Sequence, residues 1–200
     1  MLKKIGILGG TFNPVHRGHI RLAKDACLRF DLDRVLFIPC ARPPHKRPDG
    51  LAPAKHRLAM LKAAIGGESC FAVSDIEVRR GGPSYSIDTL TRLKRDDPDA
   101  RFFFIIGGDS VSELKSWRRI GELQALCTFV AAVRPGYRVR GSGRVKMFQG
   151  RPVDVSSSDI RRRIGEGKSI RRLVPAAVER YIVQHGLYQA KESRRSKHSS

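Results

Sequence analysis

Long hydrophobic runs are missing from this sequence of 200 residues. The longest, residues 127–133 with Thr128 inside it, is far shorter than the roughly 20 apolar residues of a membrane-spanning helix. A signal peptide is not indicated either, because two lysines precede only four mainly apolar residues before Gly9 and Gly10 interrupt the run. We therefore expect a soluble, cytoplasmic protein that does not engage a membrane.

Cysteine is scarce, and its spacing excludes the common uses of paired cysteines. The four cysteines stand at positions 27, 40, 70 and 127, form no C-x-x-C pair and have apolar neighbours. This pattern favours reduced thiols in the core over a disulfide framework or a zinc knuckle.

Acidic residues are few, since 19 Asp and Glu stand against 39 Lys and Arg, a net charge of +20. The excess is uneven. Residues 1–135 carry 23 basic and 14 acidic side chains, net +9, whereas residues 136–200 carry 16 and 5, net +11. A charge of this size indicates an anionic partner or substrate, such as a nucleotide, a nucleic acid or a membrane surface.

The remaining composition suits one globular domain, with 40% hydrophobic and 29% charged residues. We predict a single domain over residues 1–188, with a helical C-terminal part from about residue 156, and a basic, disordered tail over residues 189–200. Two connections are distinctive. Residues 39–53 hold five of the eleven prolines and several basic residues, which indicates a mobile, substrate-facing loop; residues 136–150, rich in Gly and Arg, are expected to be irregular.

Short runs rich in Val, Ile and Phe alternate with segments of helical spacing. The runs lack polar alternation, as do strands that are covered on both faces. We predict an α/β fold: a Rossmann-like, doubly wound parallel sheet of about five to six strands, with helices on both faces and a small C-terminal helical part. The predicted strands are residues 4–8, 34–38, 71–74, 101–106 and 127–133. The predicted helices are residues 19–30, 53–65, 86–95, 111–123 and 175–185, and one that follows the N-cap sequence 156–159.

The most informative segment follows the first predicted strand and reads GGTFNPVHRGH, residues 9–19. Its glycines allow the backbone to come close to a ligand, and the N-terminus of the next helix attracts phosphate. His16 and His19 are three residues apart and share one face of that helix. Two imidazoles in this position can donate to phosphate oxygens and stabilise charge during phosphoryl transfer.

Plainer interpretations of these residues stay open. The spacing of His16 and His19 is compatible with zinc, but no cluster of Cys, Asp or Glu nearby offers further ligands, so we predict no metal site. The two histidines are also compatible with a capping role. The segment is neither a G-x-G-x-x-G fingerprint nor a Walker A loop, and the similar residues 165–169 have Arg162 where a Walker A loop needs glycine.

Residues 9–19 resemble the H-x-G-H signature of the nucleotidylyltransferase superfamily, and the chain from Lys3 to about Tyr188 is similar to the bacterial nicotinate-nucleotide adenylyltransferase family. The narrower resemblance depends on further motifs that occur in the order of the family. These are PPHK at 43–46, PSYSIDTL at 83–90, GGDS at 107–110, Trp117, RPG at 134–136 and SSSDIR at 156–161. Asn13 and Ser158 depart from the pattern, where Asp and Thr are common.

The resemblance implies transfer of AMP from ATP to nicotinate mononucleotide, which yields nicotinate adenine dinucleotide and pyrophosphate in NAD biosynthesis. His16, His19 and Arg161 are then the catalytic residues, and Mg²⁺ is expected to accompany ATP. No protein nucleophile is needed, because positioning and charge stabilisation suffice when a phosphate itself attacks. ATP and nicotinate mononucleotide are the expected partners, nucleic acid is not required, and the choice between monomer and homodimer stays open.

The resemblance also implies two sets of binding residues. For ATP they are Gly9, Gly10, Thr11, Phe12, Gly18, Lys46, Gly107, Asp109, Ser156 and Ser158. For the mononucleotide they are Asn13, Ser84, Tyr85, Ser86, Trp117 and Arg134, with Trp117 stacked on the pyridine ring. Simpler roles exist for several of them: Asp109 and Ser156 suit helix N-caps, and a lone Trp on a helical pattern is usually a core residue.

Two alternative functions follow from the same residues. Another adenylyl- or cytidylyltransferase, with nicotinamide mononucleotide or phosphopantetheine as acceptor, would share His16 and His19 but not Trp117 and residues 84–90. A basic RNA-binding protein is less consistent with the sequence. It would need aromatic residues on a sheet face or a basic stripe, whereas most aromatics here fall in strands expected to be buried.

Overall fold

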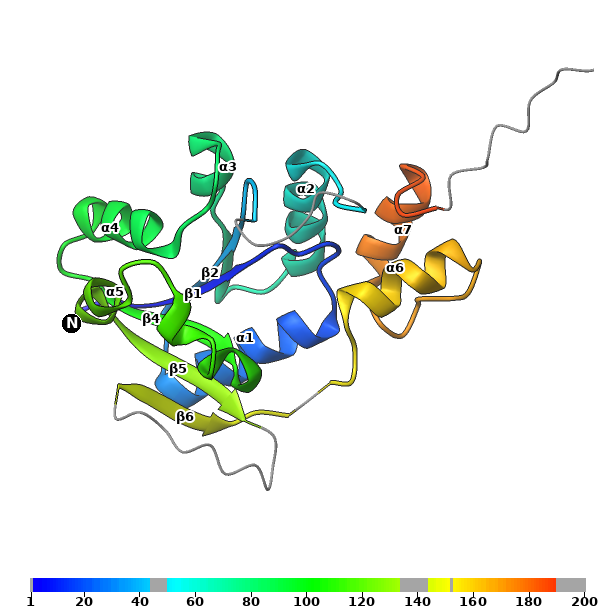
Figure 1. Ribbon diagram of the computed structural model, residues 1–200. Coiled ribbons are helices and arrows are strands. Elements are labelled where there is room, and N and C mark those ends of the chain that lie inside the picture. The colour runs from blue at the N-terminus through cyan, green and yellow to red at the C-terminus, as the bar shows by residue number, and fades with distance from the viewer. Residues whose placement is uncertain (1, 44–49, 134–143, 152, 190–200) are drawn as a thin grey trace, which may run out of the picture.

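The computed structural model describes residues 2–43, 50–133, 144–151 and 153–189. Within them, six parallel strands form one sheet in the order β3-β2-β1-β4-β5-β6 (Figure 1). The strands are β1 Lys4–Gly10, β2 Arg34–Pro39, β3 Phe71–Val73, β4 Arg101–Gly107, β5 Cys127–Val133 and β6 Val145–Gln149. The predicted doubly wound α/β fold is confirmed. Its strand order reverses between β1 and β4, which is where ligands bind in such sheets.

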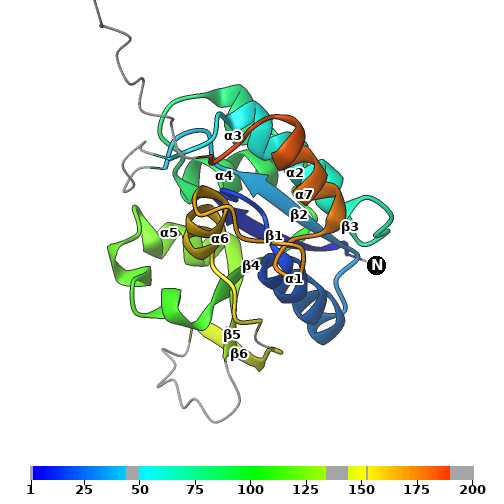
Figure 2. The same cartoon turned by 90° about the vertical axis from the view of Figure 1, so that its right-hand side faces the viewer.

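Helices cover both faces of the sheet. They are α1 Arg17–Phe30, α2 Ala54–Ile65, α3 Ile76–Arg80, α4 Ser86–Asp96, α5 Ile120–Leu126, α6 Ser157–Gly165 and α7 Ala176–Gln184, with short 3₁₀ turns at Gly108–Val111 and Leu114–Ser116. Figure 2 shows α6 and α7 beside α1, on the side of the sheet away from α4. The C-terminal helices therefore cover the same face of the sheet as α1.

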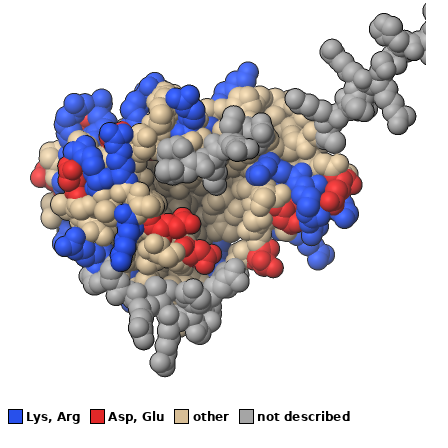
Figure 3. Space-filling view, viewed as in Figure 1, with Lys and Arg blue, Asp and Glu red and all other residues tan. Residues whose placement is uncertain are grey.

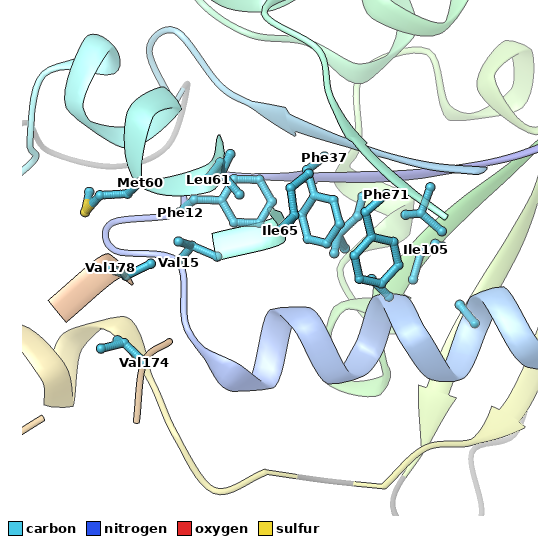
Figure 4. Close-up of a cluster of buried hydrophobic side chains, with 14 of the residues drawn as sticks. Phe12, Val15, Phe37, Met60, Leu61, Ile65, Phe71, Ile105, Val174 and Val178 are labelled. Atoms are coloured by element: carbon cyan, nitrogen blue, oxygen red, sulfur yellow. The ribbon is translucent and has the colours of Figure 1, made fainter. Parts of the chain in front are cut away.

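The core has two layers because neighbouring residues of each central strand point to opposite faces. Leu8, Phe37 and Ile105 lie in the layer under α1, α2 and α7, whereas Ile7 and Phe104 lie in the layer under α4 and α5. Figure 4 shows the first layer, in which Val174 and Val178 approach Val15. Val15 belongs to residues 9–19, called here the glycine-histidine loop. The C-terminal part of the chain thus buries the underside of that segment.

Several local predictions were wrong. Residues 136–150 are not wholly irregular, because β6 forms at their end as an edge strand. The predicted helix 111–123 is interrupted: Trp117 has an extended backbone and Arg119 a left-handed one (φ 53°), so that α5 begins only at Ile120. The extended backbone lets the Trp117 ring pack edge-on against Phe104 and Phe129, so tertiary packing overrides helical spacing here.

The cysteines also differ from expectation. Cys27, near the end of α1, and Cys70, just before β3, form a disulfide that joins positions 43 residues apart, whereas both were predicted to be reduced. The β1-α1-β2-α2-β3 winding brings the two cysteines together. Their separation of 43 residues is not a spacing that predicts a disulfide from sequence. Cys40 and Cys127 are free, and burial raises the pKa of both thiols, Cys127 to about 12.

Candidate active site

The segment between β1 and α1 turns back into the core before it reaches the histidines. Phe12 has a left-handed backbone (φ 49°) and is 2% exposed, with its ring edge-on to His19 at 4.9 Å between centroids. A Cβ atom at Gly10 would meet this ring at 3.1 Å, so any larger residue there would force the Phe12 ring to shift. The side chain of Phe12 therefore supports the loop from below, and any ligand contact at this position belongs to its backbone.

Asn13 is buried and holds three separate parts of the chain together. Its Nδ2 donates to the Gly50 carbonyl at 2.8 Å, while its Oδ1 accepts from the Ala52 N–H at 3.0 Å and from the Tyr188 hydroxyl at 2.8 Å. Its carbonyl accepts from Arg161 Nη1 at 2.8 Å. The residue predicted to bind substrate thus organises the loop, and a contact with substrate stays a prediction.

His16 and His19 stack on each other, with ring centroids 3.7 Å apart. The His16 backbone N–H donates to His19 Nδ1 at 3.2 Å, so a neutral His19 carries its proton on Nε2. Burial lowers the pKa of His16 to about 4, which makes this ring neutral at pH 7. Its Nδ1 is buried without a hydrogen-bond partner among the described residues. At pH 7 the stacked pair therefore includes at least one neutral imidazole, that of His16.

A cavity of about 740 Å³, called here the histidine cavity, opens beside this pair. It lies between the start of α1 and the turn after β4, so that His16, Gly18 and His19 face Gly107, Gly108 and Asp109 across it. Four residues after β6 complete its wall: Gly150, Arg151, Val153 and Val155. The cavity lies at the carboxyl ends of the strands near the β1–β4 switch point, where the fold predicts a ligand.

Glycines make the β4 and β6 sides of the histidine cavity possible. A Cβ atom at Gly108 would approach the Ala132 carbonyl oxygen to 2.9 Å, and one at Gly150 would approach the Ala132 Cβ to 3.0 Å. Asp109 is exposed in the turn Gly108–Val111, and its carbonyl accepts from the Ser112 hydroxyl at 3.1 Å. Asp109 therefore reaches the cavity wall from a turn that packs closely against Ala132 because residue 108 is glycine.

Two smaller cavities, called here the tryptophan cavities, lie on the other side of residues 9–11. One of about 150 Å³ is lined by Gly9, Gly10, Thr11, Glu77, Ser84 and Trp117, among others. The other, of about 250 Å³, is lined by Ser84, Tyr85, Ser86, Glu113, Ser116, Trp117 and Arg118. The predicted mononucleotide residues at 84–86 and 117 thus come together, with the Arg118 guanidinium 4.5 Å from the centre of the Tyr85 ring.

Helix α6 brings a basic residue to the glycine-histidine loop. Arg161 reaches the Asn13 carbonyl, whereas Arg162 and Arg163 pair with Asp159 on their own helix. Ser156 caps α6, because its Oγ accepts from the Asp159 N–H at 3.1 Å, and the Ser158 hydroxyl lies 3.1 Å from it. The predicted N-cap is confirmed. Figure 3 shows Lys and Arg gathered over α4 and α5 and again over α6, with a hollowed surface between them.

Two predicted site residues, Lys46 and Arg134, lie outside the described residues. Within the described part, no group of three or more His, Cys, Asp or Glu side chains is placed to hold a metal ion.

Two buried charged residues at this site were not predicted from the sequence. Arg57 on α2 is 1% exposed and Glu77 on α3 is 7% exposed. Arg57 shares the buried stripe of α2 with Met60 and Leu61 at spacings of three and four residues, a signal that could have marked it. Glu77 sits in a helix of five residues, which is too short to show a pattern.

Comparison with known proteins identifies the family. A family model described as cytidylyltransferase-like matches residues 7–163. A probable nicotinate-nucleotide adenylyltransferase of Halalkalibacterium halodurans is 48% identical over 198 residues, which are 98% of this chain and 96% of the relative. One of Thermomicrobium roseum is 40% identical over 202 residues, 96% of this chain and 94% of the relative. The chain belongs to the nicotinate-nucleotide adenylyltransferase family.

The solved structures agree on the fold of this family. Nicotinic acid mononucleotide adenylyltransferase of Plasmodium falciparum, complexed with NaAD, has a TM-score of 0.78 at 22% identity and covers 93% of this chain and 97% of its own. The family model and the relatives at 40% and 48% identity confirm the family resemblance inferred from residues 9–19 and the motifs after it. No helix in the described residues has both the length and the apolar character needed to cross a membrane.

Proposed function

We propose that this chain transfers AMP from ATP to nicotinate mononucleotide, as the names of its relatives indicate for them. One observation carries the proposal: residues 9–19, at the carboxyl end of β1, border two cavities, the histidine cavity at residues 16–19 and the smaller tryptophan cavity at residues 9–11. Two nucleotides bound on opposite sides of this loop would bring their phosphates together beside His16 and His19.

ATP occupies the histidine cavity in this proposal. The ribose lies near Gly107 and the Asp109 carboxylate, which accepts hydrogen bonds from its hydroxyls. The phosphates lie over Gly9, Gly10, Thr11, Phe12 and Gly18, where backbone N–H groups and the N-terminus of α1 favour negative charge. Ser156 and Ser158 at the start of α6 reach the far phosphates, and Lys46 adds a point charge from its loop. Magnesium enters as part of the ATP complex.

Nicotinate mononucleotide occupies the tryptophan cavities. The half-buried Trp117 ring, held by Phe104 and Phe129, is rigid enough to stack on the cationic pyridine ring. Tyr85 and Ser86 lie at the start of α4, where N–H groups without intrahelical partners attract the nicotinate carboxylate. Ser84, Asn13 and Arg134 complete the predicted contacts, the last of them toward the mononucleotide phosphate.

The transfer itself needs no covalent enzyme intermediate. An oxygen of the mononucleotide phosphate attacks the α-phosphorus of ATP, a new O–P bond forms, and the bond from the α-phosphorus to the bridging oxygen breaks to release pyrophosphate. His19 donates from Nε2 to the transferring phosphate, and the His16 ring stacks on His19 at the wall of the histidine cavity. Arg161 stabilises the growing negative charge.

The proposal also includes a cytoplasmic location and assembly as a monomer or a homodimer.

A single assay tests this function. The protein is incubated with ATP and magnesium and offered nicotinate mononucleotide, nicotinamide mononucleotide or phosphopantetheine, and pyrophosphate release is measured. We expect release with nicotinate mononucleotide. Release with phosphopantetheine alone would favour another transferase of the superfamily, and no release with either pyridine nucleotide would overturn the assignment.

A further inference from the structure

Outside the predicted contacts, the two charged side chains missed by sequence reasoning share one target, the peptide group between Cys40 and Ala41. This peptide follows β2, next to the smaller tryptophan cavity. Its carbonyl accepts from Arg57 Nη1 at 2.7 Å, and its N–H donates to the Ser84 Oγ at 2.9 Å. Ser84 and Glu77 line the same small cavity, and the Ser84 hydroxyl acts to lower the pKa of the Glu77 carboxyl. A buried cation thus binds the carbonyl end of this peptide directly, while the Ser84 hydroxyl at its N–H end separates the peptide from the buried Glu77 carboxyl.

The Arg57 side connects the loops at the carboxyl ends of two strands. Its guanidinium also donates to the Thr11 carbonyl at 2.9 Å, the Ala41 carbonyl at 3.0 Å and the Ala52 carbonyl at 2.9 Å. Four carbonyls from three separate segments therefore share one rigid, planar donor. Lysine has no such fork, so only Arg can fix their relative positions.

The Glu77 side connects the same peptide to the cavity wall. Thr89 on α4 donates to Glu77 Oε1 at 2.6 Å, and Arg80 donates to the Thr89 hydroxyl at 3.2 Å. Burial raises the pKa of Glu77, while the hydroxyls of Thr89 and Ser84 and the charge of Arg80 act in the opposite direction. Glu77 is thus tied to Ser84, which lines both tryptophan cavities.

We propose that Arg57 and Glu77 form a positioning pair that acts through the Cys40–Ala41 peptide and Ser84 to set the affinity for the mononucleotide. The proposal rests on the proposed function for the identity of the ligand. Neither residue touches the reacting phosphates. Glu77 and Ser84 line the smaller tryptophan cavity and neither lines the histidine cavity, so a change at Glu77 acts on the tryptophan side, whereas Arg57 also holds the Thr11 carbonyl.

The test uses the intact chain and its single tryptophan, Trp117. Quenching of its fluorescence by nicotinate mononucleotide gives a Kd without any turnover, and steady-state rates give the KM for ATP. Glu77→Gln keeps the shape but removes the charge, and we expect the mononucleotide Kd to rise about tenfold with the KM for ATP within about twofold of wild type. Glu122→Gln, in the exposed pair with Arg119, is the matched control and leaves both values unchanged.

A double variant separates positioning through Ser84 from a general loss of structure. If Glu77 acts through Ser84, Glu77→Gln combined with Ser84→Ala raises the Kd no more than the worse single change. A double variant whose effect is the product of both single effects would overturn the relay, as would a Glu77→Gln protein with unchanged Kd or with equal losses for both substrates. Should Glu77→Gln not fold, Thr89→Val removes one donor to the carboxyl; about a threefold rise in Kd is expected, and no rise overturns the proposal.

Failure of the two proposals can be told apart. A wild-type protein that binds nicotinate mononucleotide but releases no pyrophosphate contradicts the proposed reaction, while the positioning pair is still judged by the Kd values. Normal turnover in wild type together with an unchanged Kd in Glu77→Gln contradicts the pair alone.

Discussion

The two sides of the glycine-histidine loop are built differently. The histidine cavity, at about 740 Å³, has four glycines in its wall, at positions 18, 107, 108 and 150, beside the two histidines. The tryptophan cavities, at about 150 and 250 Å³, share Trp117 and the residues at the start of α4, and the smaller one also touches Gly9 and Gly10. One side therefore suits a ligand recognised by phosphates and backbone, whereas the other suits a ring recognised by a fixed aromatic wall.

The largest expected effect separates chemistry from binding on the histidine side. Replacing His19 by Ala removes the Nε2 donor proposed for the transferring phosphate, and we expect kcat to fall by about 10³-fold. The mononucleotide Kd from Trp117 fluorescence stays near the wild-type value, because His19 lies outside the tryptophan cavities. Near wild-type turnover in this variant would contradict the role given to the histidines.

The neutral state of His16 predicts a dependence of stability on pH. Its pKa is about 4 in the folded chain and 6.5 ordinarily, so between these values the unfolded chain binds more protons. The stabilisation is complete above pH 6.5 and is lost as the pH falls toward 4, by about 3 kcal/mol in the free energy of unfolding. Urea unfolding from pH 7 to pH 4 measures it.

The control for this prediction is His16→Asn, because other groups also titrate in that range. The difference between wild type and variant isolates the contribution of His16. Parallel pH profiles for the two proteins would show that His16 titrates normally in the folded chain.

On the tryptophan side, Trp117→Phe and Trp117→Ala test the stacking proposal. We expect the KM for nicotinate mononucleotide to rise about tenfold or more with Ala and less with Phe, which keeps an aromatic face. The KM for ATP should change little in either variant. A rise in the KM for ATP that equals the rise for the mononucleotide would indicate that Trp117 only supports the core through Phe104 and Phe129.

The same contrast explains how much the sequence could predict. The first five strands are continuous apolar runs, so their positions follow from composition and burial on both faces. Strand β6 was missed because it is a short edge strand in which exposed Lys146 interrupts the apolar run. The histidine side was predictable since its chemistry lies in one contiguous segment, residues 9–19, and in glycines beside strand ends.

The tryptophan side depends on residues that only the fold brings together. Ser84 was identified from the family motif, but its partners were not. Its hydroxyl accepts from the Ala41 N–H, about 40 residues earlier in the chain, and lies in the same cavity wall as Glu77 of α3. Asn13 likewise meets Tyr188 at the opposite end of the chain. Such contacts have no local spacing, so no pattern within a single helix or strand reveals them.

The smallest expected effect concerns Ser156, which was predicted to bind ATP and whose place in the structure is also explained by its role as the N-cap of α6. The Ser156 Oγ already accepts from the Asp159 N–H as the cap of α6, so Ser156→Ala should cost about 1 kcal/mol in the free energy of unfolding. Ser158→Ala is its control, because Ser156 and not Ser158 accepts the cap bond from the Asp159 N–H, although the two serine hydroxyls lie 3.1 Å apart. If both serines hold ATP phosphates, each variant raises the KM for ATP, yet only Ser156→Ala lowers stability. If Ser156 is solely a cap, its variant loses stability at an unchanged KM, and the phosphate site of α6 is reduced to Ser158 and Arg161.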